Sequence, residues 1–414
     1  GQIMPPVMGA VAFIMAETID VPYADIATAA VIPAFLYFFT VFAMVHLEAG
    51  RRGLTGLPRE QCPNALAALK ARWYLILPLA VLVWLLFSGY TPLFAGTVGL
   101  ALTALIVLGA PVARVIGPYG LRVVFWIALG LAAASFVEYG INGVAAVVLA
   151  LVMLLFFVKG GRETLRISLE SMADGARNAL PVGIACALVG TMIGVFTLTG
   201  VATTFATFVV EVGKNSLFLS LVLTMIACLI LGTGLPTIPN YIITASIAGP
   251  ALLSLGVPLL VSHMFVFYFG IMADLTPPVA LAAFAAAPIA GVSGQAIGWI
   301  ATRIALAGYV VPFMAVYAPA LMLQDGDPMS AAIGFWPSVA YVFLKAIIAI
   351  ILWAGTATGY LLGPLNALER VFAFVAAAML ILALPMTDEA GFAMAVGFLA
   401  WHYWCTRKPL SAQG

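Results

Sequence analysis

The sequence predicts an all-α protein that crosses a membrane many times. Of its 414 residues, 64% are hydrophobic and 8% are charged, whereas about a quarter of the residues of a soluble domain are charged. So few charges cannot cover a water-exposed surface, which excludes a soluble enzyme or a secreted domain. The apolar residues form continuous runs without alternation, so helices are expected and not the strands of a barrel. The formal net charge of +1 gives no reason to expect nucleic acid as a partner.

Each predicted span is a run of about 20 mainly apolar residues, the length that crosses the hydrocarbon core of a bilayer. Two further stretches, 1–16 and 277–290, are apolar but short, and both contain a proline pair. The predicted spans are 27–47, 73–88, 92–113, 122–137, 140–158, 179–199, 216–233, 257–273, 294–318, 335–354, 366–384 and 390–405.

Basic residues indicate the orientation of these spans. Eleven of the 17 Lys and Arg residues lie in three segments, 48–72, 114–122 and 159–178, whereas the turns 88–92 and 137–143 contain none. Two spans separate each basic segment from the next, so all three are expected on the cytoplasmic side.

Residues 162–180 have an amphipathic pattern. Leucine, methionine and alanine recur every three or four positions, and charged residues occupy the opposite face. This spacing predicts a helix along the cytoplasmic interface, and a solvated helical connector fits the same pattern.

Three apolar stretches are interrupted by glycine, proline and small polar residues: Gly1–Gly9, Gly232–Asn240 and Ala273–Val279. Proline removes a backbone donor and pushes the preceding residue out of the helical region. Irregular backbone at membrane depth is tolerated only where protein or a water-filled cavity covers it. The unpaired carbonyls would suit a hard cation, and exposed helix N-termini would suit an anion. A simple proline kink is the alternative explanation for any one of these breaks taken alone.

The first and third breaks are related in sequence. Such a recurrence is expected of a duplicated transporter, whose sites lie where the repeats meet. Asp274 is the acid that lies at a break, which marks it as a functional candidate, and Lys345 within a span is expected to pair with an acid or to reach an interface. Setting Pro5 on Pro277 aligns Ile3 with Leu275, Pro6 with Pro278, Val7 with Val279 and Ala10 with Ala282.

Catalytic and metal-binding motifs are missing from the sequence. There is no HExxH, GxSxG or P-loop, and the four cysteines and three histidines are scattered along the chain. The protein is therefore not expected to be an enzyme or to hold a zinc or histidine-based metal centre.

The run from Gly1 to Glu17, GQIMPPVMGAVAFIMAE, resembles a signature of the large (M-type) membrane subunit of tripartite ATP-independent periplasmic (TRAP) transporters. It is most similar to the TAXI branch, in which the small and large membrane subunits are commonly fused. Shorter segments resemble the same family, and the resemblance covers roughly residues 1–320. These segments are Ile32–Tyr37, Met44–Ala49, Gly232–Thr237 and Asp274–Val279.

The resemblance implies a sodium-coupled secondary transporter with an elevator-type fold of inverted repeats, each with a re-entrant hairpin and a discontinuous helix. The fused small subunit and the first hairpin are expected to precede Gly1, so this chain alone is not expected to transport. The expected divisions are 1–22 (second half of the first-repeat broken helix, in the transport domain), 23–178 (scaffold-type spans and the interfacial helix), 179–292 (second repeat, with hairpin 216–252 and broken helix 257–290), 293–354 (further scaffold-type spans) and 355–414 (a C-terminal extension with two spans).

The resemblance also implies where sodium binds, namely between the hairpin tip and the break of the following helix. Backbone carbonyls and the hydroxyl of Thr233, Thr237 or Thr276 would hold it, with Asp274 as a ligand or as a partner of backbone donors. The expected ion-binding residues are Gly232, Thr233, Gly234, Thr237, Asn240, Asp274, Thr276, Gly1 and Met4, and those at a break or beside the substrate are Pro5, Pro6, Pro236, Pro277 and Pro278.

The partners implied by the resemblance are an extracytoplasmic TAXI-type solute-binding protein, a small carboxylate substrate and the lipids of the bacterial inner membrane. No cofactor is expected besides sodium as the coupling ion. Two alternatives remain open at this point. One is an ion-coupled transporter of the same broad fold that needs no binding protein, and the other is a membrane subunit that does not itself transport.

Overall fold

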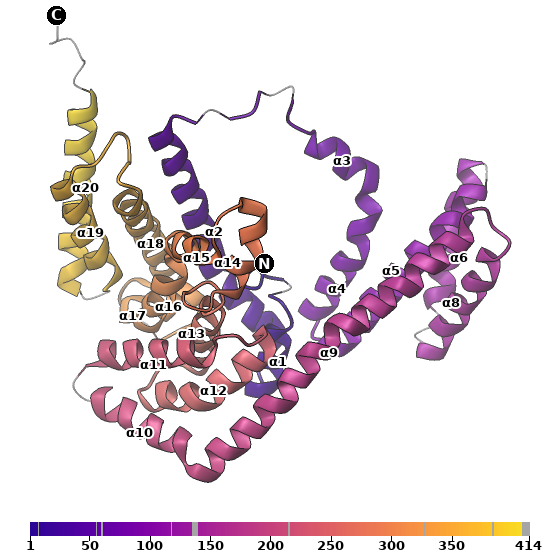
Figure 1. Cartoon of the computed structure of the whole chain (residues 1–414), viewed down its shortest axis with the longest axis horizontal. Coiled ribbons are helices and arrows are strands. Elements are labelled where there is room, and N and C mark those ends of the chain that lie inside the picture. The colour runs from indigo at the N-terminus through magenta and orange to yellow at the C-terminus, as the bar shows by residue number, and fades with distance from the viewer. Residues whose placement is uncertain are drawn as a thin grey trace, which may run out of the picture. The chain divides into compact units, whose positions relative to one another are not determined.

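The computed structural model is built from helices connected by turns and loops (Figure 1). It describes all residues except 7, 55, 59–60, 117, 135–139, 214–215, 327, 383–384 and 408–414, and no strand is found within this part of the chain. The predicted match of Val7 with Val279 and the last residues of the predicted spans 122–137 and 366–384 lie outside the described residues.

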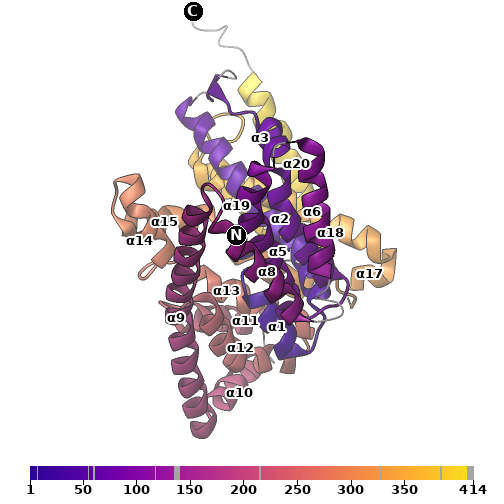
Figure 2. The ribbon, with the colours of Figure 1, turned by 90° about the vertical axis from the view of Figure 1, so that its right-hand side faces the viewer.

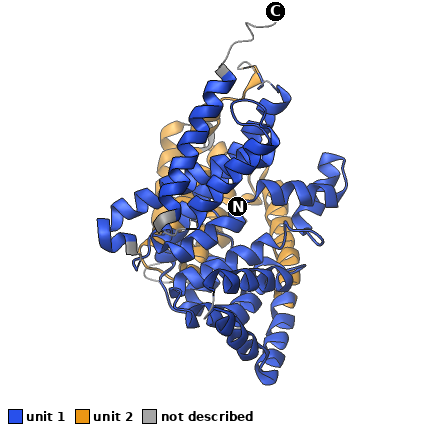
Figure 3. Cartoon of the chain, turned by 90° about the vertical axis from the view of Figure 1, so that its left-hand side faces the viewer, with its two compact units in different colours: residues 1–57, 185–414 blue, residues 58–184 orange. Residues whose placement is uncertain are grey.

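The chain forms two compact units, which divide it between residues 57 and 58 and again, within one long helix, between 184 and 185 (Figure 3). The smaller unit, 58–184, has a core of five leucines contributed by α5, α6 and α8. Its helices are α3 (Ala65–Arg72), the 3₁₀ turn η2 (Trp73–Ile76), α4 (Leu77–Phe87), α5 (Pro92–Val115), α6 (Tyr119–Ala134), α8 (Ile141–Leu155) and the first part of α9 (Gly161–Thr199).

The larger unit contains residues 1–57 and 185–414. It holds the rest of α9 and both segments that resemble each other in sequence. Its remaining elements are α1 (Val11–Ile19), α2 (Tyr23–Arg52), α10 (Val201–Gly213), α11 (Leu217–Leu231), α12 (Thr237–Ser254), α13 (Leu259–Met272), α14 (Leu281–Ala290), α15 (Gly294–Ile304), α16 (Ala307–Tyr317), η3 (Pro319–Met322), α17 (Pro328–Ile333), α18 (Phe335–Thr358), α19 (Ala367–Ile381) and α20 (Pro385–Arg407).

Helix α13 lies at the centre of the larger unit. Every residue from Leu260 to Met272 is buried, as expected of a helix that is apolar on all sides. It packs against α1, α11, α12 and α16, and Figure 2 shows α11, α12 and α13 together. Phe265 and Phe269 of α13 also contact Phe313 of α16, with ring centroids 5.4 and 5.7 Å apart. The segment after α13 is therefore positioned by a well-packed helix.

The helix lengths agree with a polytopic membrane protein. In the described part of the chain, five helical stretches are long and apolar enough to cross a bilayer, and seven shorter apolar helices accompany them. The five are Tyr23–Arg52, Pro92–Val115, Gly161–Thr199, Gly294–Tyr317 and Phe335–Thr358.

Several boundaries differ from the sequence prediction. Residues 162–180 and the span 179–199 form one continuous helix, α9, because Pro181 does not end it; the interfacial position of the first half stays a prediction. The span 294–318 is divided into α15 and α16 at Ala305 and Leu306. Helix α10 was not predicted, since 13 residues are too few to cross a bilayer.

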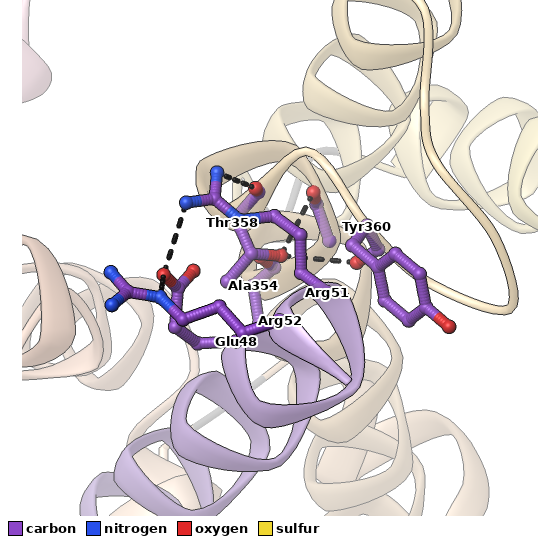
Figure 4. A network of polar contacts seen from close by, with 7 residues as sticks. Glu48, Arg51, Arg52, Ala354, Thr358 and Tyr360 are labelled. Atoms are coloured by element: carbon purple, nitrogen blue, oxygen red, sulfur yellow. Dashed lines mark hydrogen bonds and ion pairs between the residues drawn. The ribbon is translucent and has the colours of Figure 1, made fainter. Parts of the chain in front are cut away.

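A polar network joins the C-terminal ends of α2 and α18 (Figure 4). Glu48 accepts hydrogen bonds from Arg52 Nε at 2.7 Å and from Arg51 Nη2 at 3.0 Å. Arg51 Nη1 donates to the Thr358 carbonyl at 3.1 Å. The positive charge of Arg51 also interacts favourably with the negative end of the α18 helix dipole. The network therefore holds the C-terminal ends of α2 and α18 together.

Candidate functional site

The first part of the site is the turn between α11 and α12. Helix α11 ends at Leu231 and α12 begins at Thr237. Gly234 has φ +77°, a left-handed conformation that glycine adopts without steric cost. The sequence prediction was too wide here, because Thr237–Asn240 form the first turn of α12 and the non-helical backbone is confined to 232–236.

The second part of the site is the break between α13 and α14. Helix α13 ends at Met272 and α14 begins at Leu281. The irregular segment 273–280 is thus one residue longer than the predicted break Ala273–Val279. Its turns are closed by backbone hydrogen bonds, and one bond at 3.1 Å from Ala282 N to Asp274 O spans the break.

Asn240 connects these two parts. Its amide nitrogen Nδ2 donates to the Gly270 carbonyl at 2.7 Å and to the Gly232 carbonyl at 3.2 Å. The side chain is 1% exposed. Gly232 begins the turn between α11 and α12, which we call the hairpin turn, and Gly270 lies in the last turn of α13. One buried amide therefore connects the hairpin turn to the helix that precedes the break.

Both glycines leave room for this amide. A Cβ atom added at Gly270 would lie 2.5 Å from Asn240 Oδ1, and one added at Gly232 would lie 2.8 Å from Asn240 Nδ2. Real Cβ atoms essentially never approach another heavy atom this closely, so each position needs glycine for the contact to form.

Two side-chain oxygens of the site have no hydrogen-bond partner among the described residues. They are Oδ1 of Asn240 and Oδ1 of Asp274, and both atoms are buried. An unsatisfied buried oxygen is costly, and a bound cation would satisfy it. Asn240 lies in the first turn of α12, and Asp274 lies at the break between α13 and α14.

Thr276 makes its side-chain hydrogen bonds with residues of α13 and α16. Its hydroxyl lies 2.5 Å from the Met272 carbonyl and 2.5 Å from the Tyr309 hydroxyl of α16. Thr302 Oγ1 of α15 donates to the Leu275 carbonyl at 3.2 Å. Helices α15 and α16 therefore contact the break at Leu275 and Thr276.

The remaining predicted residues are placed along the same segments. Thr233 donates from Oγ1 to the Ile230 carbonyl at 2.5 Å, and Thr237 is the first, half-buried residue of α12. Pro236 caps α12, and Pro277 and Pro278 lie in the break. Their roles in ion binding stay predictions.

The break at Gly1–Gly9 has a backbone similar to that of the break at 273–280. Both proline pairs, Pro5–Pro6 and Pro277–Pro278, have a cis peptide bond, and two residues after each pair the chain is left-handed, with φ 46° at Met8 and 39° at Ala280. Positive φ is uncommon outside glycine. In both segments this residue's N–H donates to the carbonyl four positions earlier, at 3.0 Å for Met8 and 3.2 Å for Ala280.

The turn before each proline pair matches as well. Met4 N donates to Gly1 O and Thr276 N donates to Ala273 O, both at 3.3 Å. The sequence correspondence between the two segments therefore extends to the conformation and to the turn hydrogen bonds. Helix α1, which follows the first break, packs against α12 and α13, so both breaks belong to the same unit as the hairpin.

Sequence reasoning missed three contributors to this site. Gly270 interrupts an apolar run and could have been noticed as a position of close approach. Tyr309 and Thr302 gave no signal, because a single polar residue in an apolar helix does not indicate its partner.

A family model described as tripartite ATP-independent periplasmic transporter, DctM component, matches residues 1–120 and 111–329. The chain belongs to this family. It is thus the large membrane component of a TRAP transporter, an integral membrane permease of a transporter family and not of an enzyme family. The DctM family implies a solute-binding protein as a partner. The matched residues include both breaks and the α11–α12 hairpin. No curated protein and no solved structure matches the chain.

Proposed function

We propose that this DctM component is the permease of a sodium-coupled TRAP transporter of the TAXI type in a bacterial inner membrane. A TAXI-type solute-binding protein would deliver a small carboxylate, and a small-subunit region would complete the permease. Sodium would bind between the hairpin turn 232–236 and the break 273–280.

The observation that carries this proposal is the Asn240 contact. Because one buried amide binds the carbonyls of Gly232 and Gly270, the hairpin turn is held against the end of α13. A cation that binds oxygens from both segments would add to this closure. The buried Oδ1 atoms of Asn240 and Asp274, which lack donors in the described chain, fit such a cation. Oxygen atoms are the ligands that hard cations prefer.

The same region offers a place for the carboxylate. Helix α12 begins after Pro236 and α14 begins after Ala280, and neither N-terminus has a side-chain cap. At α14 the N–H of Ala282 already donates to the Asp274 carbonyl, so α12 is the preferred of the two. The first N–H groups of a helix lack intrahelical partners and attract an anion. Substrate binding next to sodium would couple the two, since each would favour the closed hairpin.

The repeated break supports an elevator-type transporter. Two equivalent breaks with the same backbone are expected where duplicated halves build one site at the middle of the membrane. In this proposal the hairpin, α13, α14 and α1 move together as the transport domain, and other spans serve as the scaffold.

Reconstituted transport tests the proposal. The complete transporter, with its small-subunit region, is placed in proteoliposomes, and uptake of a labelled carboxylate is measured with an inward sodium or potassium gradient. The proposal expects uptake only with sodium and only when the purified binding protein is added. Equal uptake under both gradients would contradict sodium coupling, and uptake without binding protein would favour the binding-protein-independent alternative.

A further inference from the structure

An apolar groove runs along the surface of the smaller unit between α4 and α5. Its volume is about 380 Å³, and six of its lining residues are Leu75, Leu79, Leu82, Leu100, Thr103 and Val107. The one hydroxyl among them, on Thr103, donates to the Gly99 carbonyl at 2.8 Å. The groove therefore offers its occupant hydrocarbon surface and no hydroxyl that needs a partner.

The two helices close the groove at one end. Gly99 lets α5 approach α4, because a Cβ atom there would lie 3.2 Å from Leu82 Cδ1. Of the lining residues, these two are the nearest to the 88–91 turn that joins the helices. The groove thus extends from Leu82 towards Leu75, roughly 10 Å at the helical rise. That is about a third of the thickness of the hydrocarbon core, so the groove is shorter than one leaflet is deep.

Basic and aromatic residues follow in the chain beyond the other end of the groove. Lys70 precedes Leu75 by five residues, Arg114 follows Val107 by seven, and both side chains are exposed. Trp73, next to the groove, is 63% exposed, and tryptophan is enriched at the level of the lipid headgroups. Between Glu60 and Glu138 the sequence contains no acidic residue. The segments beyond this end of the groove therefore carry only positive charge, which favours an anion there.

We propose that the α4–α5 groove binds an acyl chain of an anionic phospholipid from the leaflet on the side of the basic segments. The chain lies against the leucines, and the phosphate of the headgroup binds Lys70 and Arg114. Clusters of basic residues at a membrane surface attract anionic lipids by about 1 kcal/mol per residue. This inference is independent of the proposed sodium site, since it concerns the other unit of the chain.

Photo-crosslinking tests the proposal. The complete transporter is placed in bilayers that contain phosphatidylglycerol or phosphatidylcholine with the same diazirine-labelled acyl chain, and crosslinked peptides are identified by mass spectrometry. We expect phosphatidylglycerol to label peptides from 75–107 more strongly than phosphatidylcholine does. Replacing Lys70 and Arg114 with glutamine should reduce this preference about fivefold for each residue.

Two tryptophan variants separate a specific site from ordinary boundary lipid. Leu100→Trp places a larger side chain in the groove and should remove the labelling, whereas Leu131→Trp on α6, a residue that is 70% exposed, should leave it unchanged. Equal labelling by the two lipids, or labelling that survives Leu100→Trp, would overturn the proposal. Crosslinks from the groove to another protein segment in place of lipid would do so too. The glutamine variants leave the apolar lining intact, so the test does not depend on the folding of Leu100→Trp.

Discussion

Replacing Asn240 with alanine is expected to separate the hairpin turn from α13. The change removes two hydrogen bonds, to Gly270 O at 2.7 Å and to Gly232 O at 3.2 Å, from a side chain that is 1% exposed. A hydrogen bond between neutral groups contributes about 1 kcal/mol net. The docked position of the turn should therefore lose about 2 kcal/mol.

This loss would appear in the sodium dependence of transport. If sodium binds only when the turn is docked, a change of about 2 kcal/mol in docking lowers the apparent sodium affinity about 30-fold. The measurement is the sodium concentration that gives half-maximal uptake in proteoliposomes of the complete transporter. Thermal unfolding of the purified variant shows separately whether the protein is still folded.

Two further variants make this experiment specific. Asn240→Asp keeps the oxygen that is proposed to face sodium but replaces the donor with an oxygen that would face two carbonyl oxygens, so a lowered sodium affinity in this variant would identify the lost hydrogen bonds as the cause. Ser246→Ala is the matched control, because Ser246 lies on the same helix and its hydroxyl donates to Ile242 O within that helix. Unchanged sodium dependence in a folded Asn240→Ala protein would refute the reasoning.

Three other predictions follow from the same contacts. Gly270→Ala should raise the sodium concentration that gives half-maximal uptake, as Asn240→Ala does, because the new Cβ would lie 2.5 Å from Asn240 Oδ1. Uptake in proteoliposomes at several sodium concentrations measures this change. Thr276→Ala should raise the sodium concentration needed for uptake if its hydroxyl oxygen is a ligand. Lys345 is 2% exposed, and its Nζ donates to both Asp388 carboxylate oxygens at 3.0 and 2.9 Å. Asp388→Asn would leave this buried charge unpaired and should destabilise the protein by about 3–5 kcal/mol. Thermal unfolding measures the loss of stability.

Each of these has a control in the chain. Gly249→Ala should be tolerated, because its Cβ would lie 3.6 Å from His263 Nε2, an ordinary contact. Tyr309→Phe removes the hydroxyl that contacts Thr276; an equal effect of Tyr309→Phe and Thr276→Ala would show that this contact, and not a sodium ligand, explains the result. Combining Lys345→Met with Asp388→Leu should restore stability, and a double variant as unstable as Asp388→Asn would contradict the charge explanation.

The sequence identified the places where the helices break, because proline pairs and clustered glycines have local consequences. The pair Pro277 and Pro278 disfavours a helix, and α13 ends before it, at Met272. The correspondence of Pro5 with Pro277 was also readable, since similar bends of the backbone favour the same residues.

The contacts across the site could not be read in this way. The pairing of Asn240 with Gly270 depends on how α12 packs against α13, and a local pattern does not contain that information. The same holds for the Lys345–Asp388 pair, which joins residues on α18 and α20. The sequence placed Lys345 within a span and allowed an acidic partner, but the choice of Asp388 requires the tertiary structure.

Hydrogen–deuterium exchange of the complete transporter tests the central claim most directly. Amide exchange of the turn 232–236 and of the break 273–280 is followed in sodium and, for comparison, in potassium at equal ionic strength. If both segments form one sodium site, sodium should slow exchange in both and potassium in neither. Protection of only one segment, or equal exchange in the two salts, would contradict the account.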